Sequence, residues 1–138
     1  MPLNDADLRQ LLGTTRRIAV VGLSPNPRRP SHGVAAYLQA AGFRIVPVRP
    51  GVTEVLGEPA HPDLVAAART GPIDVVDVFR RSDAISSLVA ACIEIRPRLV
   101  FLQEGVSHPA SERLLEEAGI PVISDRCLMV DHQRLLGH

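Results

Sequence analysis

The segment between residues 21 and 33 carries side chains suited to binding an anion. Arg28 and Arg29 have planar guanidinium groups, whose forks of N–H donors match the geometry of a phosphate. Ser24 and Ser31 add hydroxyl groups that can donate further hydrogen bonds. The segment therefore predicts a phosphate-binding loop, and the alternative is a solvated connection with ordinary helix caps.

The same loop departs from the glycine pattern of dinucleotide-binding proteins. That pattern, G-x-G-x-x-G, begins correctly at Gly22, but Ser24 and Pro27 take its second and third positions. Gly22 still permits a tight turn, and Ser31 can cap a helix whose first N–H groups would face the ligand. The dipole of that helix would contribute roughly 0.3–1 kcal/mol to anion binding.

Arg49 follows the second apolar run of the chain. A nicotinamide-binding domain of this class usually has Asp or Glu at that point, where the carboxylate binds the ribose. Arg49 therefore argues against NAD and favours a ligand with a phosphate on its ribose, such as NADP or coenzyme A. An exposed surface arginine without a ligand is the alternative.

Three later loops supply further candidates. Phe79 could flank an adenine ring, or belong to the core instead, and Arg80 could pair with a phosphate. Gly105 allows a ligand to approach the backbone closely. Asp125 and Arg126 could pair with each other.

Cys127 is the one thiol near these loops, and Arg126 beside it could lower its pKa. A mixed disulfide with the thiol of a ligand is one hypothesis, and a buried structural cysteine is the other. Cys92 lies in an apolar helical pattern and is expected in the core. The five histidines show no metal-binding spacing, and no pattern for a catalytic reaction is found.

These loops must be positioned by alternating strands and helices. Short apolar runs predict five strands, at residues 18–21, 45–48, 73–78, 99–102 and 122–123. Helical patterns follow Asn4 and Cys127 and cover residues 31–41, 62–69, 82–95 and 109–118. The fold class is therefore α/β, a single Rossmann-like, doubly wound parallel sheet of about five strands with helices on both faces. Ligands bind such sheets at the carboxyl ends of the strands.

Individual residues and segments have expected positions in this fold. Asp74 and Asp77 suggest that the third strand lies at a sheet edge, and Pro47 must lie near a strand end or a gap in the ladder. Ser82 is expected to cap the helix at 82–95, and residues 49–61 are expected to form a long connection. One domain spans residues 1–138, with an N-terminal helix in 1–16 and the nucleotide-binding core in 17–138.

Composition narrows the classes of function. The chain has 138 residues, a net charge of zero and only 3% aromatic residues, which argues against a nucleic-acid or membrane surface. All 15 basic residues are Arg, so neither a Schiff-base lysine nor a P-loop lysine is available. No signal-peptide pattern or apolar run of about 20 residues is found, so a cytoplasmic protein is expected.

Seven short motifs, taken in order, resemble the stand-alone bacterial CoA-binding protein family. That family is similar to the N-terminal CoA-binding domain of the succinyl-CoA synthetase alpha subunit. The resemblance covers roughly residues 18–132. Its motifs are V-G-x-S from Val21, R-P-S-x-x-V from Arg29, P-V-x-P from Pro47, L-G at Leu56, D-x-F-R from Asp77, L-Q-x-G from Leu102 and D-R-C from Asp125.

The resemblance implies a role for each part of the site. The phosphates of CoA would be held by Gly22, Ser24, Arg29 and Ser31. The adenosine would be bordered by Val48 and Pro50 and flanked by Phe79 and Arg80. The pantetheine side would be lined by Gln103 and Gly105. The family commonly has Asn where this chain has Arg49.

The function expected is therefore binding of coenzyme A or an acyl-CoA, without catalysis. The synthetase relatives use a phosphorylated histidine in a second domain, and this sequence shows no such domain. Two alternatives stay open: an NADP-dependent reductase that uses Arg49, and a ligand-sensing subunit of a larger complex whose protein partner is unidentified.

Overall fold

Five parallel strands form the central sheet of this protein, whose computed structural model describes residues 3–137. The strands are β1 (Arg17–Val21), β2 (Arg44–Val48), β5 (Val75–Val78), β6 (Leu99–Leu102) and β7 (Val122–Ile123). Their order across the sheet is β2-β1-β5-β6-β7, so the chain reverses its direction of travel between β1 and β5. This doubly wound arrangement confirms the predicted fold class.

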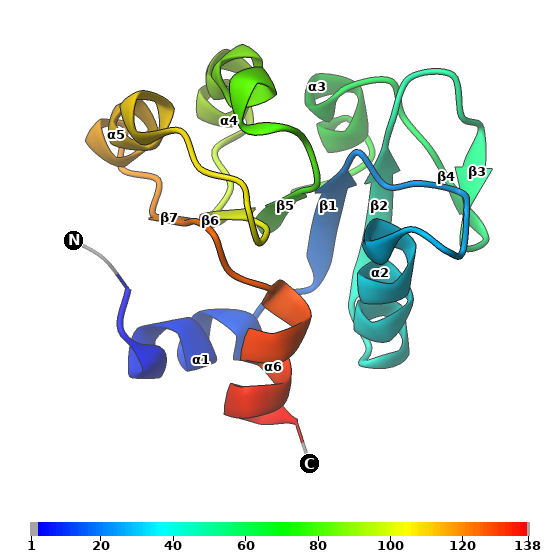
Figure 1. Ribbon diagram of the computed structural model, residues 1–138, viewed down its shortest axis with the longest axis horizontal. Helices are drawn as coiled ribbons and strands as arrows, with labels where there is room; N and C mark the ends of the chain where they lie inside the picture. The colour runs from blue at the N-terminus through cyan, green and yellow to red at the C-terminus, as the bar shows by residue number, and fades with distance from the viewer. Residues whose placement is uncertain (1–2, 138) are drawn as a thin grey trace.

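Helices cover both faces of the sheet, as Figure 1 shows. The helical segments are α1 (Asp5–Gly13), α2 (Pro30–Ala40), α3 (Leu64–Ala68), the 3-10 helix η1 (Ser82–Leu88), α4 (Val89–Ile95), α5 (Pro109–Glu117) and α6 (Leu128–Leu136). Helices α1, α2 and α6 bury their apolar residues against one face, and α3, η1, α4 and α5 against the other. The strands are apolar on both sides because both faces are buried. Among the described residues, no helix has the length and apolar character needed to cross a membrane.

Pro47 lies in β2, which is an edge strand of the sheet. The Pro47 carbonyl accepts a hydrogen bond from the His61 N–H, 3.0 Å away, on the side opposite β1. Because the N and C=O of one residue point to the same side of a strand, the missing N–H of Pro47 also faces outward. The proline therefore removes no bond from the ladder to β1.

The prediction that the third strand lies at a sheet edge is wrong. This strand, β5, is the middle strand of the five, and Asp77 within it is completely buried. The polar residues are accommodated by partners: Asp74 accepts hydrogen bonds from the backbone N–H groups of Arg16 and Arg17, both at 2.9 Å. Asp77 accepts one from the side chain of Gln103.

The connection between residues 49 and 61 contains a small hairpin that the sequence did not predict. Strands β3 (Glu54–Val55) and β4 (Glu58–Pro59) pair antiparallel around Leu56 and Gly57. Both turn residues have positive φ, 54° and 77°, as a two-residue hairpin turn of type I′ requires. The hairpin strands are two residues long, which is too short for an alternating pattern to appear in the sequence.

The helix predicted over residues 82–95 differs most from the prediction. The first half of this segment is the 3-10 helix η1, and the second half is the α-helix α4. The Ser82 side chain does not cap either of them. The Ser82 hydroxyl instead accepts a hydrogen bond from the Ser107 N–H at 3.1 Å, which ties two loops together.

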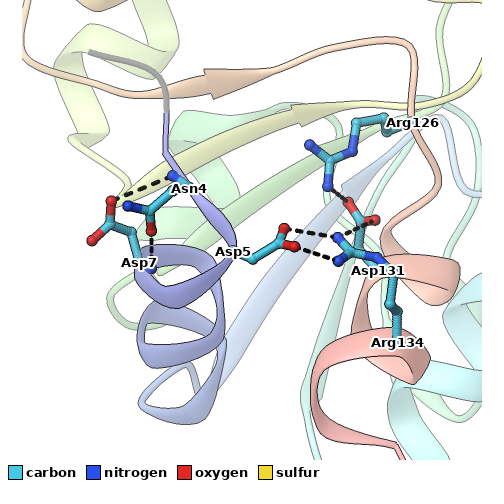
Figure 2. Close-up of polar contacts among 6 residues, drawn as sticks. All are labelled: Asn4, Asp5, Asp7, Arg126, Asp131 and Arg134. Atoms are coloured by element: carbon cyan, nitrogen blue, oxygen red, sulfur yellow. Dashed lines mark hydrogen bonds and ion pairs between the residues drawn. The ribbon is translucent and has the colours of Figure 1, made fainter.

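Helix α1 begins as predicted, with a capping box between Asn4 and Asp7 (Figure 2). Figure 2 also shows how α1 docks on α6: both Asp5 oxygens accept hydrogen bonds from Arg134, at 2.7 and 3.0 Å. Arg134 also reaches Asp131 at 3.3 Å, one turn earlier in α6. The N-terminal helix is thus joined to the last helix of the domain.

Candidate functional site

A cavity of about 1010 Å³ opens at the carboxyl ends of β1, β5 and β6. It lies where the chain reverses direction between β1 and β5, which is where ligands bind in doubly wound sheets. Its volume is at the upper end of the range for small-molecule sites. Most of the predicted site residues line it: Gly22, Ser24, Arg29, Ser31, Arg49, Phe79, Arg80 and Gln103.

Hydrogen bonds within the first loop hold it against α2. The Ser31 hydroxyl accepts the N–H of Ser24 at 3.0 Å, and the Ser24 hydroxyl accepts the N–H of Asn26 at 3.1 Å. Both serines are nearly buried, with exposures of 8% for Ser24 and 5% for Ser31. Each hydroxyl accepts within the loop and keeps its own hydrogen to donate.

The prediction that Ser31 caps α2 is wrong by two residues. The N-cap is Arg29, Pro30 is the first helical residue, and no side chain caps this end of the helix. Proline suits that position because its missing N–H would have no helical partner there. The start of α2 lines the cavity through Pro30, Ser31 and Val34, so the positive end of an uncapped helix faces the site.

Gly22 lies where the ends of three strands approach one another. Its N–H donates to the Val48 carbonyl at 2.9 Å, and its φ is 83°. A Cβ added here would lie 2.3 Å from the carbonyl oxygen of Phe79. Gly22 is therefore required both by its conformation and by the close approach of β5.

Arg49 turns toward this loop and is half-buried. Its Nη1 donates to the Gly22 carbonyl at 3.3 Å, so the guanidinium group spans from the end of β2 to the turn after β1. Arg80 and Arg81 approach the same cavity from the loop after β5. Four arginines, Arg29 among them, thus converge on one site, where an anionic ligand would be attracted.

Phe79 lies partly in the core and partly in the cavity lining. Its ring is half-buried and packs against the core cluster on the α2 side, and the same residue lines the cavity. Gln103, just after β6, is 5% exposed and also lines the cavity. Its side-chain nitrogen donates a hydrogen bond to Asp77 Oδ1 beneath the floor of the site.

The remaining predicted residues lie outside the cavity lining. Arg28 is exposed in the first loop, Val48 is buried in β2 beneath the site, and Pro50 is exposed beyond Arg49. Gly105 does not present its N–H to a ligand, because that N–H donates to Asp125 Oδ1 at 2.7 Å. This hydrogen bond joins the loop after β6 to the loop that contains Asp125.

Asp125 and Arg126, which could have paired with each other, bind other residues instead. Asp125 has a φ of 56° and binds Gly105, whereas Arg126 forms an ion pair with Asp131 at 2.7 Å (Figure 2). Asp131 thus joins Arg126 to Arg134 and, through Arg134, to α1. The loop beside the cavity is in this way connected to both terminal helices.

Sequence reasoning did not assign several lining residues: Pro25, Asn26, Pro30, Val34, Arg81, Glu104 and Val106. Arg81 and Glu104 directly follow two assigned residues, Arg80 and Gln103, so their position after a strand was a signal for them too. Val106 is an apolar residue whose sequence pattern indicates only burial, and Val34 is the last residue of the R-P-S-x-x-V motif but was given no role in the site. Their place beside the cavity depends on how the loops fold.

The two thiols differ in environment. Cys127 lines the cavity at the N-cap of α6, in agreement with its predicted position near the site. Cys92 is buried in α4, as expected, and burial raises the pKa of its thiol to about 12. Within residues 3–137, no group of three or more His, Cys, Asp or Glu side chains could hold a metal ion.

Comparisons with known proteins agree with this architecture. A family model described as CoA binding domain matches residues 16–133. The Bacillus subtilis (strain 168) protein YneT is 39% identical over 127 residues, which cover 92% of this chain and 93% of that protein.

Solved structures of similar proteins superpose on nearly the whole chain. A Thermus thermophilus protein, cell-free ID.343, superposes with a TM-score of 0.92 at 43% identity and covers 97% of this chain and 100% of its own. A hypothetical protein from Pyrococcus horikoshii OT3 also gives a TM-score of 0.92, at 33% identity, over 99% of this chain and 97% of its own. Since the family model matches most of the chain and the relatives match along nearly its whole length, this protein belongs to the CoA binding domain family.

Proposed function

We propose that this protein binds coenzyme A or an acyl-CoA in the cavity at the ends of β1, β5 and β6, without catalysing a reaction of its own. The observation that carries the proposal is the meeting of an uncapped helix N-terminus with Arg29, Arg49 and Arg80 at one cavity. Membership of the CoA binding domain family supports the choice of ligand.

The chemistry of the cavity suits the parts of coenzyme A. Its phosphates need several charge-assisted donors, which the arginines and the first turn of α2 can supply. Its adenine needs an apolar or aromatic surface, for which Phe79 is available. Its pantetheine arm is long and uncharged and carries two amides, for which the cavity offers the apolar side chains of Val34 and Val106 and the amide of Gln103.

Thermal unfolding with a series of ligands tests this proposal. A ligand at about 100 times its dissociation constant adds about 2.7 kcal/mol to the unfolding free energy, which for a domain of this size raises Tm by roughly 8 °C. We expect coenzyme A and acetyl-CoA to give such a shift, dephospho-CoA a smaller one and NAD none.

The same series distinguishes the alternatives. A shift with NADP and none with coenzyme A would contradict the proposal and favour a reductase. No shift with any ligand would also contradict it for this chain alone and would point to a site completed by a partner.

A further inference from the structure

Asp77 occupies an unusual place for a carboxyl group. It lies in the middle strand of the sheet, level with Val20 of β1 and Phe101 of β6, and has 0% exposure. Alternation along β5 directs it to the same face as Val75, where α1, α2 and α6 pack. An aliphatic residue would fill this position without the cost of removing a carboxyl group from water.

The surroundings of Asp77 provide one hydrogen bond and no charge. Gln103 Nε2 donates to Oδ1, while Oδ2 is one of two buried side-chain atoms in residues 3–137 without a hydrogen-bond partner. None of the ion pairs formed by the described residues includes Asp77. The carboxyl group is therefore directed to Gln103 alone.

The hydrogen bond between Gln103 and Asp77 determines whether the oxygen or the NH₂ group of the Gln103 amide faces the cavity. Burial raises the pKa of Asp77 to about 7, and above that pH the ionised carboxylate only accepts hydrogen bonds, so it selects the NH₂ end of the amide. The Gln103 oxygen then points away from Asp77. No donor among residues 3–137 bonds to that oxygen, and it is not one of the buried atoms without a partner, so it is open to the cavity that Gln103 lines.

We propose that Asp77 is a positioning residue: when ionised it holds Gln103 with the amide oxygen toward the cavity, so that the ligand group bound at this point must be a hydrogen-bond donor, as the amide N–H groups of a pantetheine arm are. The other polar groups of the cavity are mainly donors, which suit phosphates. Gln103 thus marks the uncharged part of the ligand. The identity of that part as the pantetheine arm rests on the proposed binding of coenzyme A, whereas the positioning of Gln103 does not.

The first test needs no ligand. The ¹³C shift of the Asp77 carboxyl and the side-chain ¹⁵N and ¹H shifts of Gln103 are followed by NMR against pH. Since burial raises the pKa of Asp77 to about 7, both groups should titrate with one midpoint near neutrality. In Asp77→Asn the Gln103 signals should lose that titration. Gln103 signals that do not follow Asp77 in the unmodified protein would overturn the proposal, even if the variant fails to fold.

The second test separates the two halves of the ligand. Calorimetry compares coenzyme A with adenosine 3′,5′-bisphosphate, which lacks the pantetheine arm. Asp77→Asn should weaken coenzyme A binding about tenfold, the effect of losing one hydrogen bond, and leave the bisphosphate within twofold. In a Gln103→Met background the Asp77 change should have no further effect, because Asp77 acts through Gln103.

Asp74→Asn is the matched control. Asp74 precedes the same strand, but its carboxylate binds the backbone of Arg16 and Arg17 and does not line the cavity. In this variant the ratio of the affinity for coenzyme A to the affinity for adenosine 3′,5′-bisphosphate should be unchanged. Equal weakening of both ligands by Asp77→Asn, or no weakening of either, would overturn the positioning role. If the unmodified protein binds neither ligand, the proposed function fails, and the NMR titration alone decides on Asp77.

Discussion

At the scale of single residues, the centre of the sheet combines tight packing with a buried acid. A side chain at position 22 would clash with the Phe79 carbonyl. Because Gly22 has none, the ends of β1 and β5 can come close together at the floor of the cavity. Asp77, in the same region of β5, is buried with a single hydrogen-bonding partner. Both features lie at or directly beneath the cavity, since Gly22 and Gln103, the partner of Asp77, line it.

Asp77 should make stability depend on pH. Burial raises its pKa from 3.8 to about 7, and the hydrogen bond from Gln103 opposes this rise only in part. Between about pH 4 and 7 the folded protein therefore keeps a proton that the unfolded chain releases. The contribution of this group to the unfolding free energy should fall across that window by on the order of 4 kcal/mol as pH rises, and stay constant above it.

Urea unfolding at several pH values measures this effect as the difference between the unmodified protein and Asp77→Asn. Asp5→Asn is a control of opposite sign, since the hydrogen bond from Arg134 lowers the pKa of Asp5. The contribution of Asp5 is present above about pH 4 and is lost as pH falls below it. A difference for Asp77 that does not change between pH 4 and 7 would contradict the buried, protonated state.

At the scale of elements, α1 and α6 are joined by a chain of charges (Figure 2). Its centre is Asp131, which is 5% exposed and lies between Arg126 and Arg134. Arg126 precedes Cys127, the N-cap of α6 and a lining residue of the cavity. The packing of the terminal helices therefore extends to the loop that borders the site.

Asp131→Ala should destabilise the protein by roughly 1–3 kcal/mol, because two arginines lose a nearly buried counter-charge. Hydrogen exchange should increase in both α1 and α6, and urea unfolding should give the loss of stability. Asp5→Ala is the matched control: its ion pair with Arg134 is exposed, so its removal should have a much smaller effect that decreases further in salt. Equal effects of the two variants would show that Asp131 does not hold the network together.

At the scale of the whole molecule, the net charge of zero conceals a local concentration of positive charge. Arginines from the loops after β1, β2 and β5 meet at one edge of the sheet because parallel strands end at the same edge. The positive charge at this cavity is thus a property of the fold rather than of the composition.

Replacing Arg29 and Arg80 together with Ala should weaken coenzyme A binding about tenfold to hundredfold and flatten its dependence on salt. Calorimetry at several salt concentrations gives both quantities. The control is a double change of Arg9 and Arg113, which removes the same charge from exposed positions on α1 and α5 outside the cavity. If the control weakens binding as much, the effect belongs to total charge and the assigned site is wrong.

The sequence predicted the fold well because each strand and helix carries its own local signal. The five apolar runs became the five parallel strands, and α1 follows Asn4 as expected. It failed where the signal was short or ambiguous. The β3–β4 hairpin is too small to show a period, and Asp74 and Asp77 suggested an edge because polar residues rarely lie in a central strand.

For the site, the sequence by itself determined which loops to expect at the cavity: glycine, serine and arginine at the ends of apolar runs predict an anion site at the carboxyl ends of the strands. The tertiary structure decided which of those residues share a cavity. Arg28, Pro50 and Gly105 lie in the right loops but outside the lining, whereas Val106 lines it without a local signal. It also placed Asp77 beneath Gln103, 26 residues away along the chain. Spacing along a strand indicates which face a side chain occupies, but its neighbour across the sheet depends on strand order and register, which form only when the whole domain packs.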